Sequence, residues 1–134
     1  MDGDLEQNGL TKLGVEGALC REYASDEKAF LGFLASSLQK ALTDEVEVTQ
    51  SGGFLSKKTL RAVTLTHGEN RFTLEDPGRG PLQAKMTHVV RGIALKTETV
   101  SVEEWLAMVS EIVEEKTAQH SAARKALQDM LGLN

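Results

Sequence analysis

The chain has 134 residues, of which 40% are hydrophobic and 26% are charged, enough for one domain with a buried core. Its single cysteine, Cys20, excludes an intramolecular disulfide framework and a cysteine-based zinc site. No apolar run approaches the roughly 20 residues of a membrane-spanning helix, and the acidic start lacks the apolar stretch of a secretory signal. We therefore expect a soluble, cytoplasmic protein that does not bind a membrane.

The net charge of −5 is distributed unevenly along the chain. Residues 1–53 carry ten acids and four bases, residues 54–97 carry three acids and eight bases, and residues 98–134 carry seven acids and three bases. The middle of the chain is thus a basic segment between two acidic segments.

The N-terminal region is predicted to begin loosely. Glycines at positions 3, 9, 14 and 17 oppose a long helix, because each costs about 1 kcal/mol relative to alanine. We expect residues 1–14 to be a flexible segment, residues 15–134 to be a single domain, and a short helix to lie near 15–23. The next helix should begin after Ser25 as its N-cap and end near Leu42, since an apolar stripe at three- to four-residue spacing fills this range.

The middle of the chain alternates apolar and polar residues, which predicts half-buried strands at 45–49, 59–66 and 71–75. Both prolines lie in the loop at 76–81. Alternation resumes over 82–97 with an interruption at Gly92. This pattern predicts either one long strand bent at Gly92 or two strands that share a kink.

The last helix has the clearest start. Ser101 followed by Glu104 forms a capping box, and an apolar face then continues to Leu131. A continuous helix of this length would span roughly 45 Å, more than a domain of this size. The helix therefore either breaks near residues 119–121 and folds back on its own domain, or projects and pairs with a second subunit. We favour the second, a homodimer, whose predicted interface consists of Ala122, Ala126, Leu127, Met130 and Leu131.

Together these elements predict an α+β fold of two layers, in the order α-β-β-β-β-α. An antiparallel sheet of about four strands would carry an N-terminal helix and a long C-terminal helix on one face. The chain is similar in size and charge to small acidic α/β secretion chaperones. Those proteins place a helix between strands, which this chain does not.

The chemistry-bearing residues form no known catalytic or metal-binding motif. His67, His88 and His120 lie in three different predicted elements, and Cys20 has no histidine nearby in the sequence. We predict no enzymatic activity, no metal and no cofactor. The basic segment supplies the candidate residues for binding an anion or a partner, namely Lys57, Lys58, Arg61, Arg71, Arg79 and Arg91.

The function that we expect is that of a non-enzymatic protein-interaction module, a bacterial-type adaptor or chaperone-like protein. It would bind protein through its sheet or its long helix. One alternative is binding of nucleic acid or an anionic ligand through residues 54–97, where phosphate contacts would use the bases. Another is a small-ligand or enzymatic domain with no recognisable motif. A contrasting account of the bases is that they pair with acids of the helices or of a second subunit.

Overall fold

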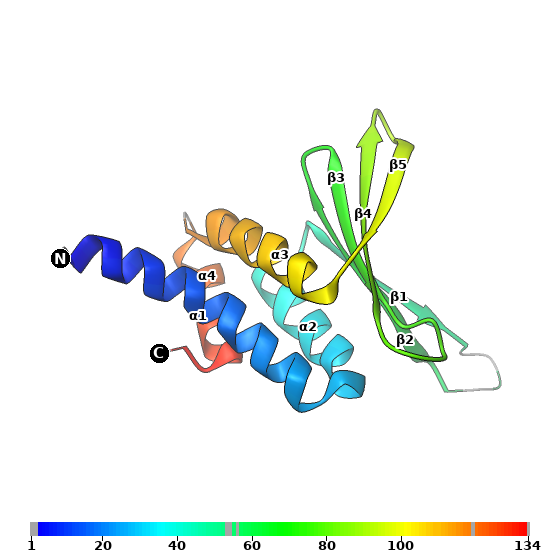
Figure 1. Ribbon diagram of the computed structural model, residues 1–134, viewed down its shortest axis with the longest axis horizontal. Coiled ribbons are helices and arrows are strands. Elements are labelled where there is room, and N and C mark those ends of the chain that lie inside the picture. Colours follow the sequence, from blue (N-terminus) through cyan, green and yellow to red (C-terminus); the bar gives the residue numbers. More distant parts are fainter. Residues whose placement is uncertain (1–2, 53–54, 56, 119, 134) are drawn as a thin grey trace.

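A computed structural model describes the backbone of residues 3–52, 55, 57–118 and 120–133, and the side chains of this set from residue 14 onward. The fold is α+β, as predicted, with four helices and a five-stranded antiparallel sheet (Figure 1). The elements in chain order are α1 (Gly3–Ser25), α2 (Glu27–Ala41), β1 (Val46–Ser51), β2 (Thr59–His67), β3 (Asn70–Glu75), β4 (Gln83–Val90), β5 (Ile93–Val100), α3 (Val102–Thr117) and α4 (Ser121–Leu131).

The sheet is a meander in which each strand pairs with the next, in the order β1-β2-β3-β4-β5. The expected bend at Gly92 is instead a complete reversal of the chain, so the sheet has five strands and not four. Arg91 and Gly92 both have positive φ, 52° and 81°, as a two-residue type I′ hairpin turn requires. The ladder between β4 and β5 runs from Val90–Ile93 beside this turn down to Ala84–Val100.

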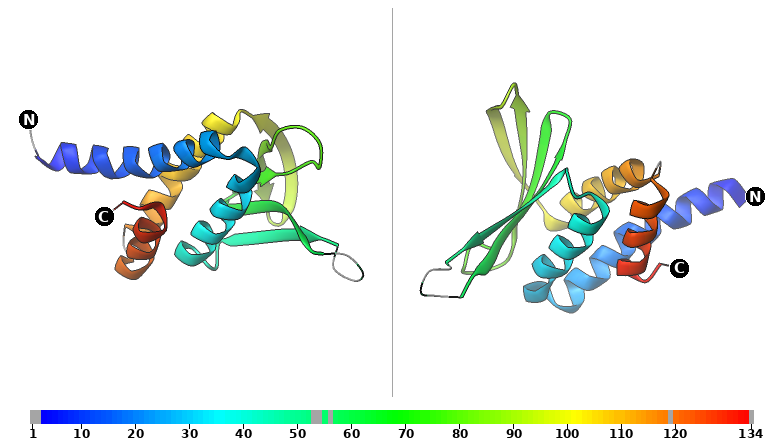
Figure 2. Two further views of the ribbon diagram at one scale, coloured as in Figure 1. Left: turned by 90° about the horizontal axis from the view of Figure 1, so that it is seen from below. Right: turned by 180° about the vertical axis from the view of Figure 1, so that it is seen from behind.

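The helices all lie on one face of the sheet (Figures 1 and 2). α2 packs against β1 and β2, and α3 packs against β3 and β4. α1 packs mainly against α3 and α2, and α4 packs mainly against α2. The helices therefore form two tiers, with α2 and α3 between the sheet and the other two helices.

The core fills the space between α2, α3 and the sheet. It includes the side chains of Leu34, Val63, Leu65, Leu74, Trp105, Leu106 and Val109, which are almost completely buried. Phe33 belongs to the apolar stripe of α2 but is only half-buried, with its ring centroid 6.4 Å from that of Phe30.

The two N-terminal helices differ from the sequence-based expectation. α1 includes the glycine-containing segment, because Val15, Ala18 and Leu19 bury one face of it and packing outweighs low helix propensity. Ser25 is the last residue of α1, and Asp26 is the N-cap of α2, where its carboxylate accepts a hydrogen bond of 3.0 Å from the Ala29 N–H. The flexibility of residues 1–14 stays a prediction.

The C-terminal region corrects the favoured prediction of one long projecting helix, because the helix breaks as the alternative had it. The Ser101 hydroxyl caps α3 by accepting from the Glu104 N–H at 3.1 Å, as expected. α3 ends at Thr117, and α4 begins after His120, which has an extended backbone conformation. α4 then packs back on α2, so the long projecting helix is replaced by a helical hairpin.

Candidate functional site

One edge of the sheet is uncovered. β5 is the last strand of the meander, and seven of its eight residues are exposed, so it presents an unpaired backbone edge to its surroundings. Ile93 and Leu95 are 64% and 61% exposed, although both are large apolar residues. An exposed strand with apolar side chains is the usual template for pairing with another chain.

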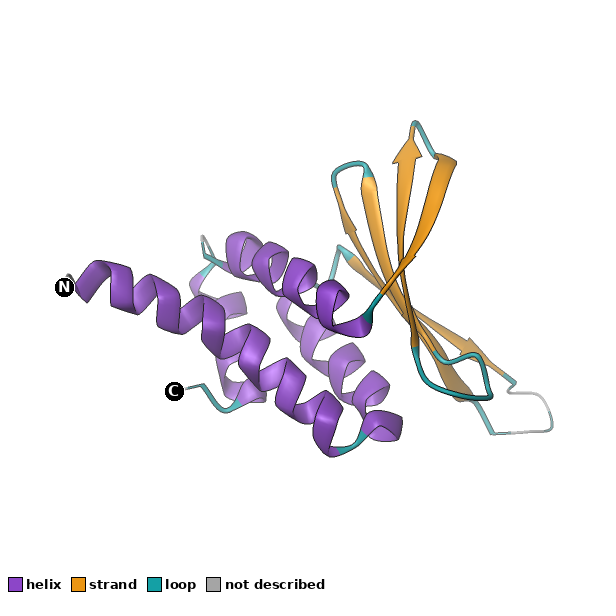
Figure 3. Ribbon diagram, in the orientation of Figure 1, coloured by secondary structure: helices purple, strands orange, loops and turns teal. Residues whose placement is uncertain are grey.

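The position of α3 explains this exposure. α3 covers β3 and β4, and the upper ends of β3, β4 and β5 stand clear of the helices (Figure 3). The pairing of β4 with β5 is irregular near the hairpin tip: His88 faces Lys96 and Val89 faces Ala94, which leaves Leu95 without a partner on β4. The apolar tip therefore lies beyond the reach of the core, whereas Val100 at the other end of β5 packs against it.

The regular part of β5 carries an exposed ion pair. The Lys96 ammonium lies 2.9 Å from the Glu98 carboxylate, with side chains 71% and 46% exposed. The hydrogen bond to Glu98 and the charge of its carboxylate raise the pKa of Lys96, so the Lys96 ammonium stays charged at neutral pH. The pair lies on the helix-covered face of the sheet, beyond the reach of the helices themselves. Lys96 and Glu98 lie opposite His88 and Met86 on β4, and these two residues are on the same face as the buried Ala84.

The face of the sheet away from the helices is polar. Hydroxyl groups pair across strands, Thr64 with Thr73 at 3.1 Å and Thr87 with Thr97 at 3.0 Å. A shallow hollow of about 330 Å³ in this face is lined by Glu47, Thr64, Thr66, Arg71, Thr73 and Thr87. Such a hydroxyl-rich surface is well solvated and does not need an apolar cover.

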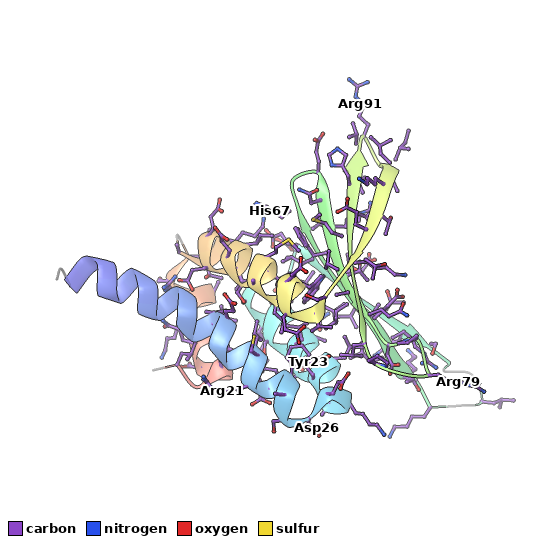
Figure 4. All side chains as sticks on the ribbon, in the orientation of Figure 1. Arg21, Tyr23, Asp26, His67, Arg79 and Arg91 are labelled. Carbon is purple, nitrogen blue, oxygen red and sulfur yellow. The ribbon has the colours of Figure 1, made fainter. Side chains whose placement is uncertain are left out.

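The predicted basic residues do not form one surface. The antiparallel order of the strands puts the β1–β2 and β3–β4 loops at one end of the sheet, with Lys57, Lys58, Arg61 and Arg79 in or beside them. The Arg61 guanidinium donates a hydrogen bond to the Ser51 hydroxyl at 2.8 Å. Arg71 lies in the hollow of the open face. Arg91 lies at the opposite tip of the sheet from Arg79 (Figure 4).

The basic segment makes ion pairs within the sheet. In the part of the chain that the structure describes, Lys85 pairs with Glu75 and Lys96 pairs with Glu98. The helices also make ion pairs of their own, for example Arg124 with Glu114 at 2.6 Å. Pairing of the strand bases with acids of the helices or of a second subunit stays a prediction.

The predicted interface on α4 is largely used inside the chain. Leu127 is 3% exposed, and Leu131 packs against the core. Ala126 and Met130 are half-buried, and Ala122 is exposed. The dimer interface on this helix and the oligomeric state both stay predictions.

The cysteine and the histidines are dispersed. Burial raises the pKa of the Cys20 thiol, and the carboxylates of Glu16 and Glu103 raise it further, so little thiolate is present at neutral pH. His67 and His88 share a face of the sheet with Asn70 between them, while His120 precedes α4. Among the described residues, no three histidine, cysteine or acidic side chains come together as a metal site requires.

A cleft of about 580 Å³ lies where the α1–α2 junction faces the loop before β4. Two of its acids have structural partners: Asp26 caps α2, and Asp76 accepts from the Gly78 N–H at 2.8 Å. These two carboxylates stabilise local structure, and the small-ligand alternative stays a prediction.

Comparisons of the chain with protein-family models, with curated proteins and with solved structures found no match. None of the described helices combines the length and the apolarity needed to cross a bilayer.

Proposed function

We propose that this chain is a non-enzymatic protein-interaction module, of the adaptor or chaperone-like kind, that binds a protein partner by strand addition at β5. The observation that carries the proposal is the exposure of β5 along seven of its eight residues, with Ile93 and Leu95 at its apolar tip. The proposal includes a cytoplasmic location and a homodimeric state, both of which rest on the sequence.

The physical basis is the unpaired backbone of an edge strand. A partner strand that pairs with β5 gains main-chain hydrogen bonds, and pockets or side chains on alternate positions select its sequence. Leu95 and Ile93 add apolar area that pairing would remove from water.

The edge is favoured over the two other surfaces that the sequence suggested. The open sheet face carries threonines that bond to each other, so covering it would gain little apolar burial. α4 buries Leu127 within its own subunit. Of the three surfaces, β5 alone combines unpaired backbone with exposed large apolar side chains.

A photoreactive residue placed at position 95 tests the proposal in cells that express the full chain. We expect position 95 to cross-link to protein, and expect Ile93→Lys to remove these cross-links, because a charge beside the edge disfavours strand pairing. The matched control places the photoreactive residue at Glu115, an exposed position on α3. Equal cross-linking from positions 95 and 115, or no effect of Ile93→Lys, would contradict the proposal.

A second function, binding of a polyanion, is favoured by the gathering of Lys57, Lys58, Arg61 and Arg79 at one end of the sheet. Phosphate contacts by these side chains would weaken steeply as salt is raised. The test is retention on immobilised single-stranded DNA over a salt series. The double variant Lys57→Glu/Lys58→Glu should elute at lower salt, and Lys28→Glu on α2 is the control; equal elution of both variants would exclude this second function.

A further inference from the structure

The sequence of β5 is complementary to itself around one residue. Lys96 and Glu98 flank Thr97, and both lie on the same face of the strand because they are two residues apart. The irregularity at His88 and Val89 lies outside this stretch, which pairs regularly with β4 as far as Val100. The two opposite charges are therefore held in a regular, exposed part of the edge.

We propose that the occupant of the β5 edge is a second copy of this chain, paired antiparallel with its own β5 about a two-fold axis through Thr97. This inference rests on the proposed strand addition at β5 and names its partner. The two meanders would join into one continuous sheet, and the helices of both copies would lie on the same side of it.

Symmetry leaves few registers for such a contact. A two-fold axis between antiparallel edge strands is normal to the sheet, so paired residues lie on the same face of the joined sheet. The axis then runs between one residue and the same residue of the second copy. An axis through Lys96 sets this lysine against itself, and an axis through Glu98 does the same with two carboxylates. An axis through Thr97 sets Lys96 of each copy against Glu98 of the other, twice.

The central position fits this register. Thr97 of each copy faces Thr97 of the other, a cross-strand threonine pair like those already present on the open face of the sheet. A lysine on an exposed edge normally opposes pairing with another strand. Here each Lys96 pairs with a carboxylate of the second copy. Lys96 therefore favours pairing with a second copy of this chain and disfavours pairing with strands that lack an acid at the matching position.

The experiment is a charge exchange in the full chain, read by sedimentation equilibrium at micromolar concentration. We expect the wild type to have a mass near twice the 14.6 kDa of one chain. Lys96→Glu and Glu98→Lys should each weaken self-association by about tenfold or more, because each sets like charges face to face at both contacts. An equimolar mixture of the two variants should form a heterodimer, since every contact between them again joins opposite charges. The double variant Lys96→Glu/Glu98→Lys should dimerise like the wild type.

Matched controls are Lys28→Glu and Glu115→Lys, which make the same charge changes at exposed positions on α2 and α3. Circular dichroism on every variant checks that the fold is retained. A monomeric wild type overturns this inference, and so does a dimer that the charge exchange leaves unchanged. If the wild type is monomeric while position 95 still cross-links to another protein, strand addition at β5 stands and the second copy is the wrong partner. If the dimer obeys the charge exchange, both stand.

Discussion

The two edge strands of the sheet, β1 and β5, belong to one meander, but the helices cover β1 and leave β5 uncovered. β1 begins with Val46, which is 9% exposed, and α2 packs against β1 and β2. β5 has no comparable helix, since α3 stands over β3 and β4. Whether an edge strand joins the core therefore depends on which strands the neighbouring helix covers. Two edge strands can show the same alternation of apolar and polar residues and still differ in burial.

The difference has an energetic side. Side chains on β1 and β2 that point toward α2 remove apolar area from water, whereas Ile93 and Leu95 leave most of theirs exposed. Burial of apolar side chains stabilises the fold on the β1 side of the sheet. On the β5 side, apolar side chains stay exposed and are available for binding.

The sharpest test of this contrast compares two leucines on strands. Leu65 on β2 is completely buried, and Leu65→Ala should lower the free energy of unfolding by about 2–5 kcal/mol through the cavity it leaves. Leu95→Ala should change it by no more than about 0.5 kcal/mol, because Leu95 is 61% exposed. Urea unfolding of the two variants at low protein concentration measures both values. Similar losses would mean that β5 is buried after all.

The junction between β5 and α3 should give the next largest change in the free energy of unfolding. Ser101 caps α3 directly after the strand, so Ser101→Ala should cost about 0.5–2 kcal/mol of stability. Ser101→Asp keeps an acceptor at the N-cap and serves as the control, with little loss expected. A denaturant midpoint that is the same for Ser101→Ala and the wild type would show that the cap does not contribute.

The hairpin tip gives the smallest effect and one of opposite sign. Arg91 has a φ of 52°, a left-handed conformation that asparagine tolerates better than arginine. Arg91→Asn should raise the stability by a few tenths to about 1 kcal/mol. Gly92→Ala, at φ 81°, should lower it by about 1 kcal/mol. Thermal melts measure both, and a stabilising Gly92→Ala would contradict the type I′ turn.

Local sequence signals predicted much of this fold. Alternation located the strands, and the capping box located the start of α3 at Ser101. The same signals misjudged places where the decision is made by packing. Glycine at position 14 is accepted in α1 because Val15, Ala18 and Leu19 are buried beside it. The interruption at Gly92 predicted a kink, and the full turn lacks its usual signal because the first turn position holds Arg91, an unusual residue for positive φ.

The candidate site was harder to predict than the fold. Sequence analysis placed binding residues by charge and by the stripe on α4, but Arg79 and Arg91 lie at opposite ends of the sheet and Leu127 is buried. The exposure of Ile93 and Leu95 depends on strand order and on the reach of α3, neither of which appears in the local pattern. One signal was available: the lysine and glutamate on either side of Thr97 are visible in the sequence as a near-palindrome of charge.

The closing of α4 over α2 has a consequence for synthesis on the ribosome. Leu133 lies against the α1 backbone, where a Cβ at Gly14 would be 3.6 Å from its methyl groups, and Leu127 completes the core from the opposite end of the sequence. The sheet and the first helices leave the exit tunnel earlier, with an unfilled site where α4 belongs. Contacts between such distant segments form late, so a nascent chain keeps apolar surface uncovered until α4 emerges. Translation that stalls before α4 should therefore give a species that general chaperones hold, even though every strand has already been made.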